Sequence, residues 1–147
     1  MDSIESQEEF MTSITVRTIG TYRGENRAWL QSKHGAGPND SPSITLDVSK
    51  FTKATHFPED YLPSGIVLGK VTASGLYGPY TPGATGPNAG LENPVGILFS
   101  SLPVRAGDTR IGAAIVQHGF VDAAKLPAGN GLDANARTKL PLIVFTN

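Results

Sequence analysis

The stretch IVLGKVTASGLYGPYTPGATGPNAGLENPVGILF, residues 66–99, decides the class of fold. Its two ends, IVLGKVTA (66–73) and VGILF (95–99), are short apolar runs rich in β-branched residues, which is typical of buried strands. The middle, LYGPYTPGATGPNAG (76–90), is dense in glycine and proline and therefore predicts a long turn-rich loop. Two buried strands joined by such a loop indicate a β-rich domain.

The segments on either side continue this pattern. Strands are predicted where Ile44, Leu46 and Val48 alternate, over IGAAIVQHGFV (111–121), and over PLIVFTN at the end of the chain. Short helical turns are predicted in HFPEDYLPSG (56–65), opened by Pro58, and in DAAKLP (122–127). LDANARTKL (132–140) predicts a short helix capped by Asp133. We therefore predict one mainly β domain with short helical turns and long loops.

The N-terminal part has a different sequence pattern. SITVRTIGTYR (13–23) alternates, with one face formed by Ile14, Val16, Thr18 and Tyr22, and so predicts a half-buried strand. GENRAWLQSKHGAGPNDSPS (24–43) is predicted to be a long linker. We accordingly divide the chain into an extended arm and linker, 1–43, and a β domain, 44–147. Trp29 and Leu30 form an apolar pair within the linker, and either the domain itself or a partner surface must cover them.

Composition excludes several classes of protein. Glycine and proline number 17 and 11, together 28 of 147 residues, which argues against a helical bundle or a coiled coil. The net charge of −1 leaves no basic excess for general nucleic-acid binding. Cysteine is absent, so there is no disulfide framework and no thiolate ligand or nucleophile. No apolar run reaches the length of a membrane span, and the acidic N-terminus does not resemble a signal peptide.

Catalytic motifs are missing from the sequence. Gly65–Val71 has neither the spacing nor the hydroxyl of a phosphate-binding loop, and no nucleophile elbow is present. His56 with Glu59 and Asp60 has the ingredients of a metal site, but no second histidine lies at ligand spacing, so a polar turn is the expected interpretation. We therefore expect no enzymatic activity, no cofactor and no metal.

A compact aromatic–proline cluster is formed by Tyr77, Pro79 and Tyr80, with Pro82 close by. Such a cluster either makes a loop rigid, because proline fixes its backbone and tyrosine packs on it, or forms a binding patch for a sugar or a peptide. We retain it as a possible interface loop.

From Ile44 onward the chain resembles the bacteriophage head decoration proteins of the lambda D type. The resemblance covers about residues 44–146, leaving the longer N-terminal part outside it. The residues that carry it are LDVSKFT (46–52), LPSGIVLGKVTASGLYGPY (62–80), VGILF (95–99), AAIVQHGFVDAAKLP (113–127) and LDANARTKLPLIVF (132–145).

This resemblance implies a small β-clip or β-tulip barrel that assembles as a homotrimer. It also implies that trimers bind the major capsid protein on the outside of the icosahedral head after the shell expands, and cement it against the pressure of packaged DNA. The chain would then be made in the host cytoplasm and end on the virion surface, with no nucleic-acid or membrane partner. Apolar segments at 66–68, 111–116 and 142–145, which a small domain would not bury alone, favour association of copies.

The contact with the shell is expected to come from the N-terminal part. The arm residues Ile14, Val16, Thr18 and Tyr22, with Trp29, are predicted to bind the capsid. The rival function is a β-rich adhesion module, such as a head fibre or tail component that binds glycans through Tyr77 and Tyr80.

Overall fold

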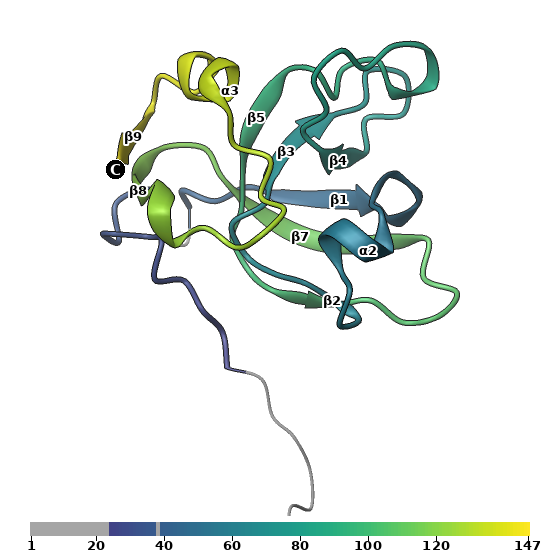
Figure 1. Ribbon diagram of the computed structural model, residues 1–147, viewed down its shortest axis with the longest axis horizontal. Helices are drawn as coiled ribbons and strands as arrows, with labels where there is room; N and C mark the ends of the chain where they lie inside the picture. Colours follow the sequence, from purple (N-terminus) through teal and green to yellow (C-terminus); the bar gives the residue numbers. More distant parts are fainter. Residues whose placement is uncertain (1–23, 38) are drawn as a thin grey trace, which may run out of the picture.

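A computed structural model describes residues 24–37 and 39–147. Its centre is a closed barrel with the strand order β1-β4-β3-β5-β7 (Figure 1). These strands are β1 (Ser43–Asp47), β3 (Val67–Lys70), β4 (Tyr77–Pro79), β5 (Pro94–Leu98) and β7 (Arg110–Val116). β1 closes the barrel by pairing antiparallel with β7 and parallel with β4. The mainly β prediction is therefore confirmed, with a barrel as its core.

Two small sheets flank the barrel. β2 (Tyr61–Leu62) pairs antiparallel with β6 (Leu102–Pro103), and β8 (Gly119–Asp122) pairs parallel with β9 (Ile143–Thr146). The helical elements are all short: η1 (Val48–Lys50), α2 (Lys53–His56), η2 (Gly86–Asn88), η3 (Ala123–Lys125) and α3 (Ala134–Lys139). In Figure 1, β8, β9 and α3 lie together at one end of the molecule, beside the C-terminus.

The strands β3 and β5 are covered on both faces. Neighbouring residues on each strand belong to different clusters: Val67 and Ile97 to one, Leu68 and Leu98 to the other. This explains why their sequences are continuous apolar runs rather than alternating ones. Gly96 lets β5 approach β7 closely, because a Cβ at that position would lie 2.5 Å from the carbonyl oxygen of Val116.

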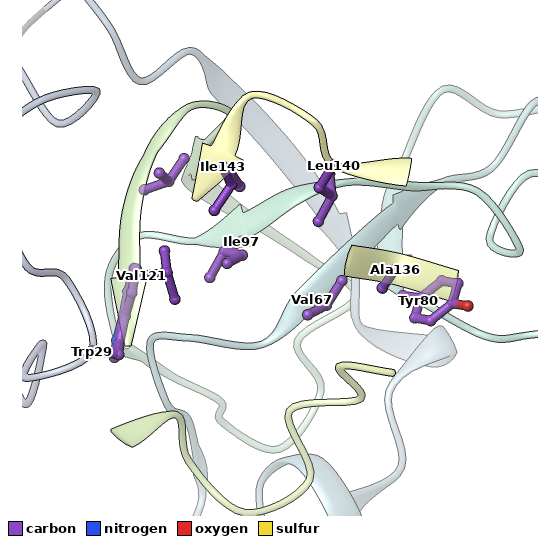
Figure 2. Packing of buried hydrophobic residues seen from close by; sticks show 9 residues of the cluster. Trp29, Val67, Tyr80, Ile97, Val121, Ala136, Leu140 and Ile143 are labelled. Carbon is purple, nitrogen blue, oxygen red and sulfur yellow. The ribbon is translucent and has the colours of Figure 1, made fainter. Parts of the chain in front are cut away.

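One of these clusters connects the barrel to the β8–β9 end of the molecule. It contains Trp29, Val67, Tyr80, Ile97, Val116, Val121, Ala136, Leu140 and Ile143. Figure 2 shows how these side chains meet from the barrel, α3, β9 and the N-terminal segment. The β8–β9 sheet and α3 therefore form part of the same folded unit as the barrel.

Several predicted elements are confirmed. β1, β3, β5, β7, β8 and β9 form within the predicted segments or within one residue of them, and η3 forms within 122–127. Asp133 caps α3 as predicted, its side chain accepting a hydrogen bond from the Ala136 amide at 2.7 Å. The strand predicted over 13–23 lies outside the described residues.

Two predictions were wrong in detail. No helical turn opens at Pro58 within 56–65, because α2 ends at His56 and Tyr61–Leu62 form β2. Phe57 precedes Pro58, and the residue before a proline is disfavoured in the helical region. Residues 76–90 are not all loop, because Tyr77–Pro79 form the barrel strand β4. Gly78 and Pro79 resemble turn residues, but the packing of the barrel holds them extended.

Candidate interaction surface

Four of the predicted capsid-contacting residues, Ile14, Val16, Thr18 and Tyr22, lie outside the described residues. The fifth, Trp29, lies in the core with 1% of its surface exposed. Of the two covers that the sequence allowed for Trp29, the structure shows the domain itself. Trp29 is thus unavailable as an exposed contact for a shell, and its role is to hold the N-terminal segment.

The segment around Trp29 is fixed to the domain by its backbone as well as by its side chain. The Trp29 carbonyl accepts a hydrogen bond from the Asp122 amide at 2.7 Å, and the Gln31 amide donates to the Phe120 carbonyl at 3.0 Å. Leu30 forms an antiparallel bridge with Val121. Residues 29–31 therefore lie along β8 on the side away from β9.

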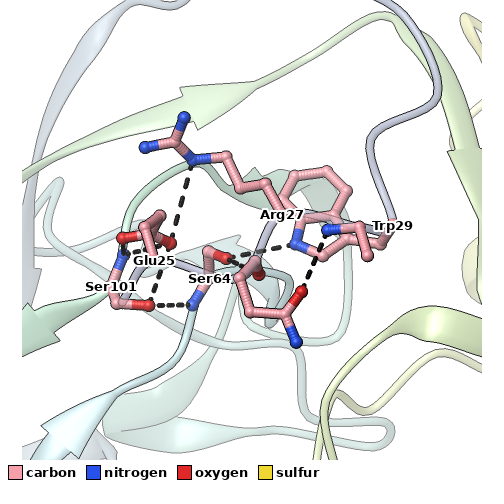
Figure 3. Close-up of polar contacts among 7 residues, drawn as sticks. Glu25, Arg27, Trp29, Ser64 and Ser101 are labelled. Carbon is pink, nitrogen blue, oxygen red and sulfur yellow. Dashed lines mark hydrogen bonds and ion pairs between the residues drawn. The ribbon is translucent and has the colours of Figure 1, made fainter. Parts of the chain in front are cut away.

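Polar side chains secure the same segment further towards the N-terminus (Figure 3). The Trp29 indole N–H donates to the Ser64 hydroxyl at 3.1 Å, and that hydroxyl donates to the Asn26 carbonyl at 3.0 Å. The Glu25 carboxylate accepts from both the amide and the hydroxyl of Ser101. The Arg27 guanidinium lies 4.3 Å from the centre of the Phe99 ring. Residues 25–31 are therefore firmly attached to the domain, and we call them the root of the arm. Any arm before Gly24 extends from this fixed segment.

Tyr77, Pro79 and Tyr80, which the sequence offered as a possible interface loop, lie in and next to barrel strand β4. Tyr80 is only 5% exposed, and its hydroxyl donates to the Asp133 carboxylate at 3.1 Å and accepts from Asn135 at 2.8 Å. Pro79 is buried as well, and Tyr77 is half-buried in β4 beside the Lys70 ammonium group. These three residues therefore help to build the barrel and do not form an exposed aromatic patch.

An exposed apolar surface lies instead on the β8–β9 sheet. Among the described residues, the large hydrophobic side chains that remain exposed are Phe120 (41%), Leu142 (70%) and Val144 (49%). Phe120 is the register partner of Val144, so their side chains lie on the same face of the sheet. Leu142 is exposed in the turn immediately before β9. We name Phe120, Leu142 and Val144 the β8–β9 face.

The signal for this face was present in the sequence. Residues 142–145 are all apolar, and the structure buries only one side of the strand: Ile143 is in the core and Phe145 packs against it. Sequence alone could not show which alternate set would be covered, because this depends on where α3 and Trp29 pack.

The β domain of this chain matches the model of a known protein family. Residues 40–140 match the model described as Bacteriophage lambda head decoration protein D. The chain belongs to this family. A search of curated proteins found no match for it.

Membership of the lambda head decoration protein D family places the chain among the proteins that associate with the phage capsid and hence with the virion. The family is a structural one and not an enzyme family. The match also confirms the resemblance that was drawn from residues 44–146. In the part of this decoration-family chain that the structure describes, no helix is long and apolar enough to cross a membrane.

The one cluster with metal-like ingredients is already engaged in local contacts. The His56 Nδ1 atom accepts a hydrogen bond from the Thr52 amide at 2.9 Å, and Asp60 forms an ion pair with Lys53 at 3.2 Å. Over residues 24–37 and 39–147, no group of three or more histidine, cysteine, aspartate or glutamate side chains is arranged to hold a metal ion.

We predict that the stability of this decoration-family domain depends on pH through His56. Burial of the imidazole lowers the pKa of His56 below its ordinary value of 6.5. The unfolded chain therefore binds more protons than the native state as the pH falls below 6.5, and the native state loses stability there until its own pKa is passed. Protonation would also put a hydrogen on Nδ1, where the Thr52 amide donates.

The measurement is the free energy of unfolding by denaturant between pH 5 and pH 8. We expect His56→Asn to flatten the slope below pH 6.5, and His118→Asn to leave most of it in place. An unchanged slope in His56→Asn would assign the dependence to other groups.

Proposed function

We propose that this chain binds as a homotrimer to the outside of the expanded phage head and strengthens the shell against the pressure of packaged DNA. The observation that carries the proposal is the match to the head decoration family over residues 40–140, on a domain that folds as a closed β-barrel. The three subunits of one trimer bind the shell with avidity, so each subunit needs only a modest contact with the major capsid protein.

The arm is the proposed anchor on the shell. Ile14, Val16, Thr18 and Tyr22 share one side of an alternating segment, which is the pattern expected for a strand that adds to the edge of a partner's sheet. The fixed root at Glu25 and Trp29 supports this role, because tension on the arm is transmitted to the core of the domain. Trp29 therefore acts in the proposal as the attachment of the arm and not as a shell contact.

The burial of Tyr80 argues against the alternative function, a glycan-binding adhesion module. Glycan binding through Tyr77 and Tyr80 requires both rings to be accessible, and the Tyr80 ring is buried with its hydroxyl bonded to Asp133 and Asn135. No other observation favours an adhesion role.

Binding is tested by co-sedimentation of the full chain with expanded heads and with unexpanded procapsids. We expect binding to expanded heads at least about tenfold tighter than to procapsids, because a ligand stabilises the state that it prefers. Failure to sediment with either particle would contradict a decoration role.

The cementing role has its own test, which is heat resistance of heads that hold full-length genomes. Heads without the protein should release DNA at a lower temperature than decorated heads, because each bound trimer adds its binding free energy to the closed shell. Equal survival of bare and decorated heads would mean that the protein binds the head without strengthening it.

A further inference from the structure

We propose that the β8–β9 face, formed by Phe120, Leu142 and Val144, is where copies of this chain contact one another in the trimer. The inference rests on the homotrimer of the proposed function and assigns a surface to it. Nothing in the family match specifies which residues of this chain meet in an assembly.

The first argument is the concentration of exposed apolar area. The described part of the chain buries its other large hydrophobic side chains at least partly, yet leaves Phe120 and Val144 exposed as a cross-strand pair and Leu142 exposed just before β9. Scattered exposed hydrophobic residues are ordinary, but a contiguous group of them is a mark of an interaction surface. The opposite side of the sheet is core, with Val121 and Ile143 in the cluster of Figure 2.

The second argument is that the face is held in place before any partner arrives. β8 is bonded to β9 along one edge and to residues 29–31 along the other. At the end of β9, Asn147 donates to the Asp122 carboxylate at 3.1 Å, and the Arg137 guanidinium lies 5.5 Å from the Phe145 ring centre. A preformed face loses little conformational freedom on association, so a small apolar area can contribute effectively to binding.

The third argument is charge. The three residues of the face are uncharged. The His34 ring lies beside Phe120, with ring centres 6.0 Å apart, and the His118 ring lies 5.2 Å from that of His34. Copies of such a face can meet without burying an unpaired charge, as contacts between permanent subunits require. The net charge of −1 on the whole chain adds little repulsion between copies.

The fourth argument distinguishes a second copy from the chain's own arm. The arm joins the domain at Gly24, which lines a surface hollow of about 270 Å³ with Tyr61, Leu102 and Pro103. Figure 1 shows the start of the described chain and β9 well apart on the molecule. The face is therefore not where the arm begins. A second copy is, moreover, the one partner present whenever the free protein is in solution, before any head has formed.

An apolar face of this kind is suited to a position on a three-fold axis. Around the axis, the same patch of three subunits converges, so the apolar side chains of each copy are enclosed by those of the other two. The ring closes after three copies, which leaves no apolar face exposed for further growth.

The experiment compares the full chain with Leu142→Asp and Val144→Asp by light scattering over a wide range of concentrations, alongside co-sedimentation with expanded heads. The matched control is Thr45→Asp, which places the same charge at an exposed position of barrel strand β1. Circular dichroism establishes that each variant is folded. Because Leu142 is 70% exposed, its replacement removes little of the subunit's own packing.

We expect both the Leu142→Asp and the Val144→Asp variant to dissociate to monomers at concentrations about a hundredfold higher than the parent, with Thr45→Asp unchanged, because an unpaired carboxylate would have to be buried in the contact. If these two variants are folded and stay trimeric, the assignment is overturned. If they stay trimeric but no longer bind heads, the face belongs to the shell contact, and the decoration function stands without this inference. A parent that is monomeric yet binds heads would likewise overturn the inference alone, whereas a trimeric parent that does not bind heads would contradict the proposed function alone.

Discussion

A chain lacking residues 1–23 folds and still forms trimers but no longer binds expanded heads, if the arm is the anchor. The domain should survive the deletion, because Glu25 and Trp29 remain to fix the N-terminal segment. Binding should be lost, because strand addition draws its affinity from the main-chain hydrogen bonds of the added strand. Co-sedimentation measures the loss, and circular dichroism with light scattering establishes that fold and assembly are kept.

The orientation of the arm can be tested with two neighbouring substitutions. Val16→Asp puts a charge on the apolar side of the alternating segment, whereas Arg17→Asp changes the polar side. Ordering the arm costs about 1–2 kcal/mol per residue in backbone entropy, and contacts of the apolar side must offset this. We expect Val16→Asp to weaken head binding about tenfold or more and Arg17→Asp to weaken it less. If the truncated chain decorates heads as tightly as the intact one, the shell contact lies on the domain.

The strands that could be predicted from sequence are those whose pattern is local. β3 and β5 appear as continuous apolar runs because both of their faces are buried, and α3 is marked by Asp133 as its cap. The strand β4 could not be predicted from its own residues. Gly78 is needed there because a Cβ would lie 2.9 Å from that of Lys50, a contact that arises because η1 packs against β4.

The candidate surface could be predicted only in part, for a similar reason. The apolar segment 142–145 indicated association of copies, but the division into buried Ile143 and exposed Leu142 and Val144 depends on long-range packing. The indole of Trp29 makes the same point, since its hydrogen-bond partner Ser64 lies 35 residues away. A linker composition and a buried tryptophan are compatible, because a few long-range contacts can fix a segment that has little local preference.

Trp29→Ala should destabilise the domain severely. The indole is 1% exposed and packs in the cluster that joins the barrel to β8, β9 and α3. Its loss leaves a large cavity and leaves the Ser64 hydroxyl without the indole N–H, so we expect a cost of about 3–5 kcal/mol. In a domain of this size, that corresponds to a melting temperature lowered by roughly 6–20 °C.

Trp29→Phe is the matched control, because it keeps most of the apolar packing and removes the bond to Ser64. We expect it to cost about 1–2 kcal/mol. The free energy of unfolding is measured by denaturant titration at one fixed protein concentration, since the stability of an assembling protein depends on concentration. A loss below about 1 kcal/mol in Trp29→Ala would mean that residues 25–31 are not part of the cooperative unit. A loss of the expected size, together with weaker head binding in the variant, would instead show that the packing of Trp29 in the core supports binding by the arm. The same indole would then both hold the domain together and anchor its attachment to the shell.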